Sequence, residues 1–328
     1  MRPLHLLAGA LLLLDPQAAS AQAVAWNMST EYPQSAMPGV GITTFAAHLT
    51  EASAGRLQIK PSFDTSGGIR SADMIAAIVQ GRVQAGDAFA STLSDVDPIF
   101  ALASLPFLVN SIADARRLAD LARPFFAAAL QKKGQRLLYL TPWPPSGVWS
   151  KTPLKTSADL AHLSIRTYDT ISSEVFASAG AKAISISFAD TMPKLADGSI
   201  NAVLSSGDGG AGRELWKFLP FFSEITYSLP LSVAIVSQPI YDGLSPELRD
   251  AVDSASRETE NELWSAMRAR QQENYRRMRE NGVTIESGVA PDVIAQLQSG
   301  AAAAQQAWCA RSGPACQQVL EAFKAGKP

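Results

Sequence analysis

Arg166 is the residue of this chain whose type and position most plainly suggest chemistry. It follows the alternating run Leu163-Ser164-Ile165, so we expect it near the carboxyl end of a strand. In open α/β sheets, ligands bind outside that end of the strands. A guanidinium there offers two parallel donors to a carboxylate. The sequence therefore predicts that Arg166 anchors a small organic acid; a structural salt bridge is the alternative that position alone leaves open.

A stretch rich in serine and glycine, residues 205–210, follows a second expected strand over 201–204. The hydroxyls of Ser205 and Ser206 are suited to bonding a hydroxyl or keto oxygen of a ligand, and amides at a helix start favour an anion. We expect ligand contact from Ser205 more than from Asp208. The alternatives are a flexible turn and a phosphate-binding loop, and the stretch lacks the lysine and the spacing of a P-loop.

Aromatic side chains are the candidates for the walls of a pocket. Each is more often a core residue than a site residue, yet we expect two of the set to line the cleft, Trp149 and Phe89 first. The set is Phe89, Trp143, Trp149, Tyr168 and Tyr227. Arg70, after the glycine pair at 67–68, is expected either to approach a ligand or to be solvated.

No arrangement in the sequence is typical of catalysis. A Gly-x-Ser-x-Gly elbow is absent, and His48 and His162 lie in no recognisable nucleophile context. Ser206 with Asp208 could be imagined as a catalytic pair, but no base is found to activate the serine. We therefore expect a binding protein without a cofactor, and an exported enzyme is the less favoured hypothesis.

The two cysteines, Cys309 and Cys316, are separated by a turn-prone Ser-Gly-Pro stretch at 312–314. In an exported protein such a pair favours a disulfide. A metal site is the weaker reading because the histidines are scattered and no zinc spacing exists.

The first residues have the form of a secretory signal peptide. Arg2 precedes an apolar core over residues 4–14, and small residues lead up to Ala21. We expect residues 1–21 to be removed by cleavage after Ala21. The apolar core is too short to span a bilayer, which disfavours the alternative of an N-terminal anchor.

The composition of the chain limits the classes of partner that it is expected to bind. The 328 residues carry a net charge of −2 with no basic excess, which disfavours nucleic-acid binding because that needs clustered Lys and Arg. A mature chain of roughly 300 residues is long enough for two lobes, each with its own core.

The elements that must position these residues alternate between strand and helix. A first unit has expected strands at 24–28, 57–59, 83–89 and 136–140. Helical patterns lie between them, at 39–54, 72–81 and 111–133. A second unit runs from about Gly147 to Pro230, with a helix-like segment at 212–218, and an apolar strand at 231–236 follows. The predicted fold class is α/β, with two α/β domains around a ligand cleft.

A long helix follows that strand. Ser245 and Pro246 form a helix start, and no proline or glycine occurs from 247 to 281, until Gly282 ends the run. Such a helix is roughly 50 Å long. A coiled-coil dimer would want a stricter heptad, so we expect the helix to brace both domains.

This order of elements resembles that of the periplasmic solute-binding proteins of tripartite ATP-independent periplasmic (TRAP) transporters. The family-like stretches are residues 45–86, 102–109 (LASLPFLV), 156–167 (TSADLAHLSIRT), 186–203 and 244–252 (LSPELRDAV). The resemblance implies a periplasmic binding protein-like fold, a hinge, and the long helix along both domains. It also implies organic acid ligands, with Arg166 at the position of the family's carboxylate-binding arginine. The implied partner is a permease of one small and one large integral membrane subunit.

On this basis we place domain I at 24–145 plus 231–267 and domain II at 146–230 plus 268–328. The mature protein is expected in the periplasm. An extracytoplasmic sensor subunit of the same fold is the alternative to a transport receptor.

Departures from the family pattern bear on the ligand. Sialic-acid-binding members carry a second arginine where this chain has Ser146, and a glutamate where it has Phe89. The family's frequent asparagine in the second domain is matched by Ser205. The resemblance therefore implies a smaller, less charged and more aromatic pocket for one carboxylate. We expect a 2-hydroxy or 2-oxo monocarboxylate, such as a mandelate-like or pantoate-like acid.

Overall fold

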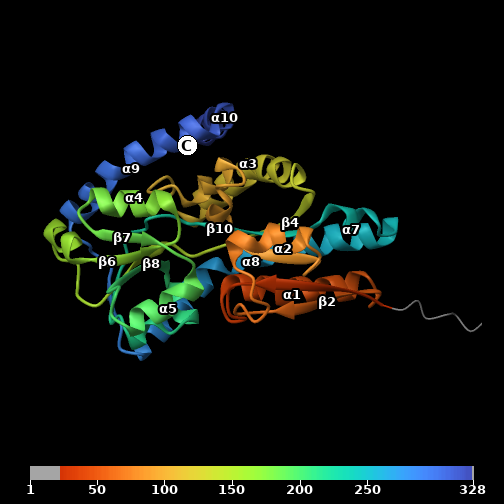
Figure 1. Cartoon of the computed structure of the whole chain (residues 1–328), viewed down its shortest axis with the longest axis horizontal. Coiled ribbons are helices and arrows are strands. Elements are labelled where there is room, and N and C mark those ends of the chain that lie inside the picture. The colour runs from red at the N-terminus through yellow and green to blue at the C-terminus, as the bar shows by residue number, and fades with distance from the viewer. Residues whose placement is uncertain (1–22, 327–328) are drawn as a thin grey trace, which may run out of the picture.

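The computed structural model describes residues 23–326, and its strands form two sheets (Figure 1). The predicted signal peptide, residues 1–21, lies outside the described residues. Within them, no helix is both long and apolar enough to cross a membrane.

The first sheet has five strands in the order β2-β1-β3-β10-β4. Strand β1 runs parallel to β2 and β3, whereas β10 is antiparallel to β3 and β4 and pairs its Val233 with Ala88 and Leu140. The strands are β1 (Val24–Thr30), β2 (Leu57–Ser62), β3 (Ala85–Phe89), β4 (Gln135–Pro142) and β10 (Leu231–Ser237). The helices of this part are α1 (Met37–Ala52), α2 (Met74–Val79), α3 (Ile112–Gln131) and α7 (Gln238–Asp242). We call this sheet with its helices the first lobe.

The second sheet has six strands in the order β11-β9-β5-β8-β6-β7. Strand β6 is parallel to β7 and β8, and β5 is antiparallel to β8 and β9. The strands are β5 (Ser146–Ser150), β6 (Ser164–Thr167), β7 (Lys182–Ser185), β8 (Ala202–Ser206), β9 (Phe221–Ser223) and β11 (Thr284–Glu286). Its helices are α4 (Thr170–Ser178), α5 (Phe188–Ala196) and α6 (Gly207–Gly212). We call this sheet with its helices the second lobe.

The elements begin where the sequence offers caps and apolar runs. The side chains of Ser111, Asp169 and Ser187 each accept a hydrogen bond from an amide in the first turn of α3, α4 and α5. The central strands β3, β5 and β8 are buried along their whole length, so their pattern is one of continuous burial rather than alternation.

Helix α8 (Pro246–Glu280) spans both lobes, as the sequence predicts. Ser245 caps it, accepting the Leu248 amide at 3.4 Å, and Asn281 with Gly282 at φ 82° ends it. The helix packs on α1 and β4 of the first lobe and on α6 and β11 of the second. The α/β fold class and the bracing role of this helix are thereby confirmed.

The C-terminal helices α9 (Pro291–Ser312) and α10 (Pro314–Ala325) also reach both lobes. Helix α9 packs on α4, and α10 packs on α3 (Figure 1). Gly313, at φ 58°, forms the turn between them, and a disulfide joins Cys309 to Cys316 across it.

One predicted helix is divided in the structure. Helix α6 begins earlier than the expected range 212–218, at Gly207, because Ser206 caps it by accepting the Gly209 amide at 3.1 Å. A short 3₁₀ helix, Leu215–Lys217, lies within the expected range. The chain crosses between the lobes at 143–145 and 224–230. The domain boundaries given above, residue by residue, stay a prediction.

Candidate ligand-binding site

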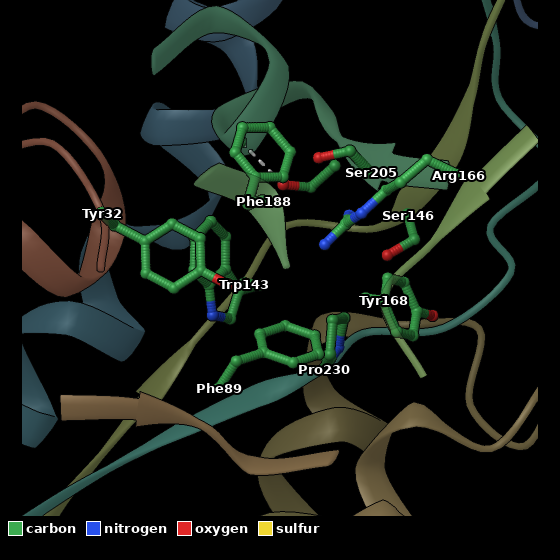
Figure 2. Close-up of a pocket in the computed structure, with 11 residues that line it drawn as sticks. Tyr32, Phe89, Trp143, Ser146, Arg166, Tyr168, Phe188, Ser205 and Pro230 are labelled. Atoms are coloured by element: carbon green, nitrogen blue, oxygen red, sulfur yellow. Dashed lines mark hydrogen bonds between the residues drawn. The ribbon is translucent and has the colours of Figure 1, made fainter. Parts of the chain in front are cut away.

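A cavity lies between the two lobes, with about 300 Å³ of space free of protein atoms (Figure 2). Both lobes and both crossing segments contribute to its wall. The lining residues are Tyr32, Phe89, Trp143, Ser146, Arg166, Tyr168, Phe188, Ser205, Ser206, Gly209 and Pro230. Of the residues predicted from the sequence, the structure brings together Arg166, Ser205, Ser206, Phe89, Trp143 and Tyr168 at this cavity.

Arg166 is the single charged residue among those lining residues. It sits in β6, only 3% exposed, opposite Ile184 of β7 and Val203 of β8. Its Nε donates to the carbonyl oxygen of Ile186 at 3.0 Å and its Nη1 to that of Leu204 at 3.3 Å. Within residues 23–326, no hydrogen bond engages Nη2 and no ion pair involves Arg166. The backbone bonds orient the guanidinium and leave one edge of it open to the cavity.

Among the described residues, no carboxylate forms an ion pair with the Arg166 guanidinium. Burial lowers the pKa of the Arg166 guanidinium, and nearby Tyr32 and Glu31 act in the opposite direction. An arginine nevertheless keeps its proton in proteins. A buried cation without an anion is unfavourable, so a carboxylate that enters the cavity relieves an existing electrostatic deficit.

The serines differ in what they can offer a ligand. Ser206 Oγ accepts the Gly209 amide at 3.1 Å, so it is already used as a helix cap. Ser205 Oγ has no hydrogen bond to any described residue. A Cβ at position 209 would lie 2.5 Å from Ser205 Oγ, closer than such atoms approach. Glycine at this position therefore leaves Ser205 accessible.

Aromatic rings form most of the remaining wall. The ring centroids of Tyr32 and Trp143 lie 4.8 Å apart, and those of Phe89 and Tyr168 lie 5.1 Å apart. The ring of Phe188 lies 5.0 Å from the Arg166 guanidinium carbon, in cation–π contact. Figure 2 shows these rings around the space into which the guanidinium points.

The polar tips of these rings are mostly engaged. Trp143 Nε1 donates to Ser232 Oγ at 3.0 Å, and the Tyr168 hydroxyl meets Ser228 Oγ at 2.7 Å. Burial raises the pKa of Tyr168 and of Tyr32, so both phenols stay neutral. The wall is thus apolar in character, without a second charge.

Two predicted aromatic residues lie outside the cavity, which corrects the expectation for them. Trp149, the first choice from the sequence, is fully buried in the second lobe, where its ring packs 5.2 Å from that of Phe222. On β5 its side chain points to the face opposite that of Ser146, because strand side chains alternate. Tyr227 is also fully buried, between Phe107 and Phe176.

Asp208 is a structural residue rather than a cavity residue. It is completely buried and accepts the Met37 amide at 2.8 Å and Asn274 Nδ2 at 2.9 Å. It also forms an ion pair with Arg270 of α8. These partners consume its oxygens and turn it away from the lining.

Arg70 lies at the rim of the cleft. Its Nη2 contacts Asp190 Oδ1 at 2.6 Å, and its Nε donates to Ser187 Oγ at 3.3 Å. It lines a groove beside the cavity together with Glu31 and Tyr168. Arg70 therefore joins the two lobes and does not reach the cavity.

Sequence reasoning missed Tyr32, Phe188 and Pro230, and it noted Ser146 only as a departure from a family pattern. Tyr32 follows the carboxyl end of β1, and Phe188 starts α5 just after β7. The rule that places ligands at the carboxyl ends of strands, applied to Arg166, could have found both. No cluster of metal-ligating side chains occurs in the part of the chain that the structure describes.

Comparison with known proteins finds a family model and several relatives that are similar to this chain. A family model, "Bacterial extracellular solute-binding protein, family 7", matches residues 28–308. The 2,3-diketo-L-gulonate-binding periplasmic protein YiaO of Escherichia coli K12 is 26% identical over 244 residues, which are 72% of this chain and 73% of YiaO.

Two solved structures are similar over nearly the whole chain. DctP7, a Bordetella pertussis extracytoplasmic solute receptor binding pyroglutamic acid, is 29% identical with a TM-score of 0.88, covering 92% of this chain and 100% of DctP7. A TRAP solute-binding protein from a marine metagenome, in complex with co-purified pyroglutamate, is 26% identical with a TM-score of 0.86; 93% of this chain and 99% of that one are covered.

Proposed function

This chain belongs to family 7 of the bacterial extracellular solute-binding proteins, the solute receptors of TRAP transporters, and from that premise we propose that it captures a compact organic acid with a single carboxylate. We rank pyroglutamate first, because it is the ligand named for two relatives above 25% identity. A 2-hydroxy or 2-oxo monocarboxylate of similar size is the wider class. Delivery goes to a membrane permease, from the periplasm, after removal of residues 1–21.

The observation that carries this proposal is the open edge of Arg166. Two of its three nitrogens are held by backbone carbonyls, Nη2 has no hydrogen-bond partner among the described residues, and the side chain lines the cavity. A carboxylate docked there gains a charge-assisted hydrogen bond and neutralises the buried cation. Ser205 Oγ, on the neighbouring strand, can bond an oxygen or N–H next to that carboxylate.

The rest of the lining supports a compact, singly charged acid. A second carboxylate would be buried without a cation, because the other lining residues are neutral. A chain of sugar hydroxyls would meet Phe89, Trp143 and Phe188, which offer few hydrogen-bonding atoms. A small ring such as that of pyroglutamate can pack on these aromatic faces.

Calorimetric titration against a panel of acids tests the proposal. The panel holds pyroglutamate, mandelate, pantoate, lactate, succinate and galactonate. We expect binding of the compact monocarboxylates only. Binding confined to succinate or galactonate would show that the single-carboxylate interpretation is wrong.

Arg166→Ala should weaken binding of the best acid about a hundredfold or more, because charge-assisted bonds of about 1.5–3 kcal/mol each are lost. Arg166→Lys should also bind poorly, since an ammonium cannot reproduce the planar fork. Arg257→Ala, which removes an exposed arginine on α8, serves as the matched control. Retention of full affinity by Arg166→Ala contradicts the proposal.

A further inference from the structure

We propose that Glu31 is a positioning residue that couples closure of the lobes to assembly of the carboxylate clamp. Glu31 is not among the residues that line the cavity. It acts through Phe188 and Tyr32, which do line it. The inference rests on the proposed function and adds to it the residue that sets how long the closed state lasts.

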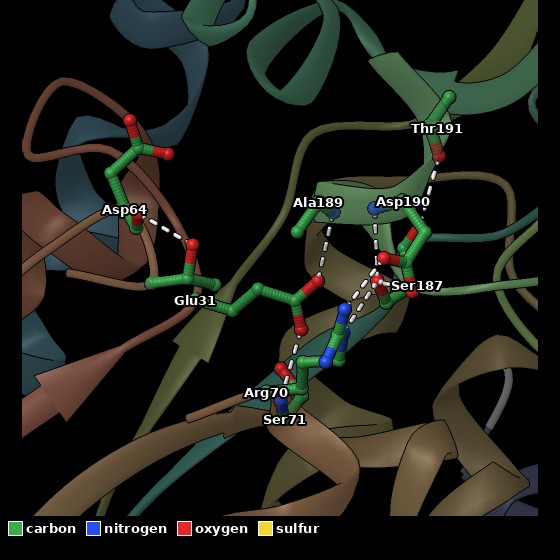
Figure 3. Close-up of polar contacts among 9 residues, drawn as sticks. Glu31, Asp64, Arg70, Ser71, Ser187, Ala189, Asp190 and Thr191 are labelled. Carbon is green, nitrogen blue, oxygen red and sulfur yellow. Dashed lines mark hydrogen bonds and ion pairs between the residues drawn. The ribbon is translucent and has the colours of Figure 1, made fainter. Parts of the chain in front are cut away.

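Glu31 directly follows β1 and is only 2% exposed. Its Oε2 accepts the Ser71 amide of the first lobe at 2.9 Å. Its Oε1 accepts the Ala189 amide, at the start of α5 in the second lobe, at 3.1 Å (Figure 3). One buried carboxylate thus bonds an amide of each lobe. No ion pair engages Glu31 within residues 23–326, so these amides are what satisfies its oxygens.

The neighbours of these bonded residues line the cavity. Phe188, which precedes Ala189, stacks 5.0 Å from the Arg166 guanidinium carbon. Tyr32, which follows Glu31, has its ring centroid 6.2 Å from that of Phe188. The bond from Ala189 to Glu31 therefore fixes the relative position of two aromatic walls that come from opposite lobes.

Arg213 reinforces the same seam. Its Nη2 donates to the backbone carbonyl of Glu31 at 3.0 Å, and its guanidinium carbon lies 5.8 Å from the Phe188 ring. It also pairs with Asp64 of the first lobe. Glu31 is thus held on both its backbone and its side chain by groups of the second lobe.

The Arg70–Asp190 pair crosses the same seam and provides a natural comparison. Its side chains are 46% and 45% exposed, and exposed ion pairs contribute little in water. Glu31 is buried, so breaking its hydrogen bonds leaves a buried acceptor without donors or buried donors without an acceptor. Either result is strongly unfavourable. We therefore expect Glu31, and not the more conspicuous ion pair, to hold the lobes together.

The two bonds of Glu31 also differ in when they exist. The bond to Ser71 lies within one lobe and persists when the lobes part. The bond to Ala189 crosses the cleft and exists only in the closed state. Its loss should therefore speed ligand release with little effect on association, because it lowers the population of the closed state alone.

Stopped-flow kinetics with pyroglutamate as the probe test this split. Glu31→Ala should raise the dissociation rate constant about tenfold to a hundredfold, with the association rate constant nearly unchanged. Glu31→Gln, which keeps one carbonyl oxygen, should lie between Glu31→Ala and the parent protein. Arg70→Ala should change dissociation less than about fivefold, and Glu51→Ala, an exposed site on α1, should change nothing. A dissociation rate constant does not depend on the fraction of protein that is folded, so a partly unfolded variant cannot mimic the result.

A measurement with whichever acid of the panel binds best separates failure of this proposal from failure of the proposed ligand. With each protein saturated with that acid, amide hydrogen exchange of the segment 187–192 should be faster in Glu31→Ala and Glu31→Gln than in the parent protein. If pyroglutamate fails to bind the parent, the proposed ligand is wrong, and the exchange experiment still decides the role of Glu31. Unchanged exchange in this segment, or a Glu31→Ala dissociation rate equal to that of Arg70→Ala, overturns the proposal.

Discussion

Arg166 and Ser205 lie on neighbouring parallel strands, β6 and β8, and this shared sheet edge is what brings a cation and a free hydroxyl together. The first lobe also contains a buried ionisable group close to the cavity. Asp87 of β3 is fully buried, with Thr141 Oγ1 at 3.4 Å from its carboxylate. Burial raises the pKa of Asp87 to about 8, while hydrogen bonds from Thr141 and Ser232 lower it. Ser232 also accepts the Trp143 indole, so Asp87 lies one residue removed from the cavity wall.

The pKa of Asp87 predicts a dependence of stability on pH. Between about pH 4 and pH 8 the unfolded chain ionises this carboxyl, whereas the folded protein keeps it protonated. Stability is therefore full below the unfolded pKa and falls as pH rises towards 8. Asp87→Asn cannot ionise, so its free energy of unfolding should not fall in this way as the pH rises. Between pH 4 and pH 8 its stability relative to the parent should increase by about 1.4 kcal/mol per pH unit at most, a gain of a few kcal/mol in all. Urea unfolding at both pH values measures it; an Asn variant that gains nothing at pH 8 would show that Asp87 is already ionised.

At the scale of elements, the short helix α6 is fastened to two others by a single carboxylate. Asp208 on α6 bonds the first amide of α1 and two side chains of α8. These bonds hold the junction of β8 and α6, where Ser205 and Gly209 line the cavity. The long helix α8 therefore positions part of the site as well as bracing the lobes.

Asp208→Asn should destabilise the protein by about 2–4 kcal/mol, because it leaves Arg270 largely buried without its anion. Asp190→Asn, which breaks an ion pair that is nearly half exposed, is the matched control and should cost less than about 1 kcal/mol. Denaturant unfolding of both variants checks the difference. Equal losses of stability in the two variants would show that the buried ion pair of Asp208 contributes no more than the exposed ion pair of Asp190.

At the scale of the molecule, contacts of several kinds join the two lobes. The contacts of Glu31, Arg70 and Arg213 form one seam, and helices α8, α9 and α10 together pack on elements of both lobes. A ligand shifts the balance towards this closed arrangement only if it contacts both lobes. Arg166 and Ser205 from the second lobe, with Tyr32 and Phe89 from the first, provide such contacts.

Small-angle X-ray scattering should therefore show a smaller radius of gyration when the best organic acid of the panel is added. Arg166→Ala, at the same acid concentration, should keep the radius of the ligand-free protein, because the acid then has no anchor through which to favour the closed state. An identical radius for the parent protein with and without the acid would show that the lobes close without it.

What the sequence determined by itself was local. Capping residues and the absence of glycine and proline predicted a helix from 245 to 281, and α8 spans Pro246–Glu280. Alternation placed Arg166 near a strand end, and a turn-prone segment predicted the pairing of Cys309 with Cys316. Only the tertiary structure decided which side chains share the cavity. On β5, Ser146 enters it and Trp149 does not, because strand side chains alternate and only packing fixes which face of the strand is turned inward. Glu31 meets Ala189 across 158 positions of sequence. Contacts of that range leave no periodicity to read, since they arise from how separately folded layers come together.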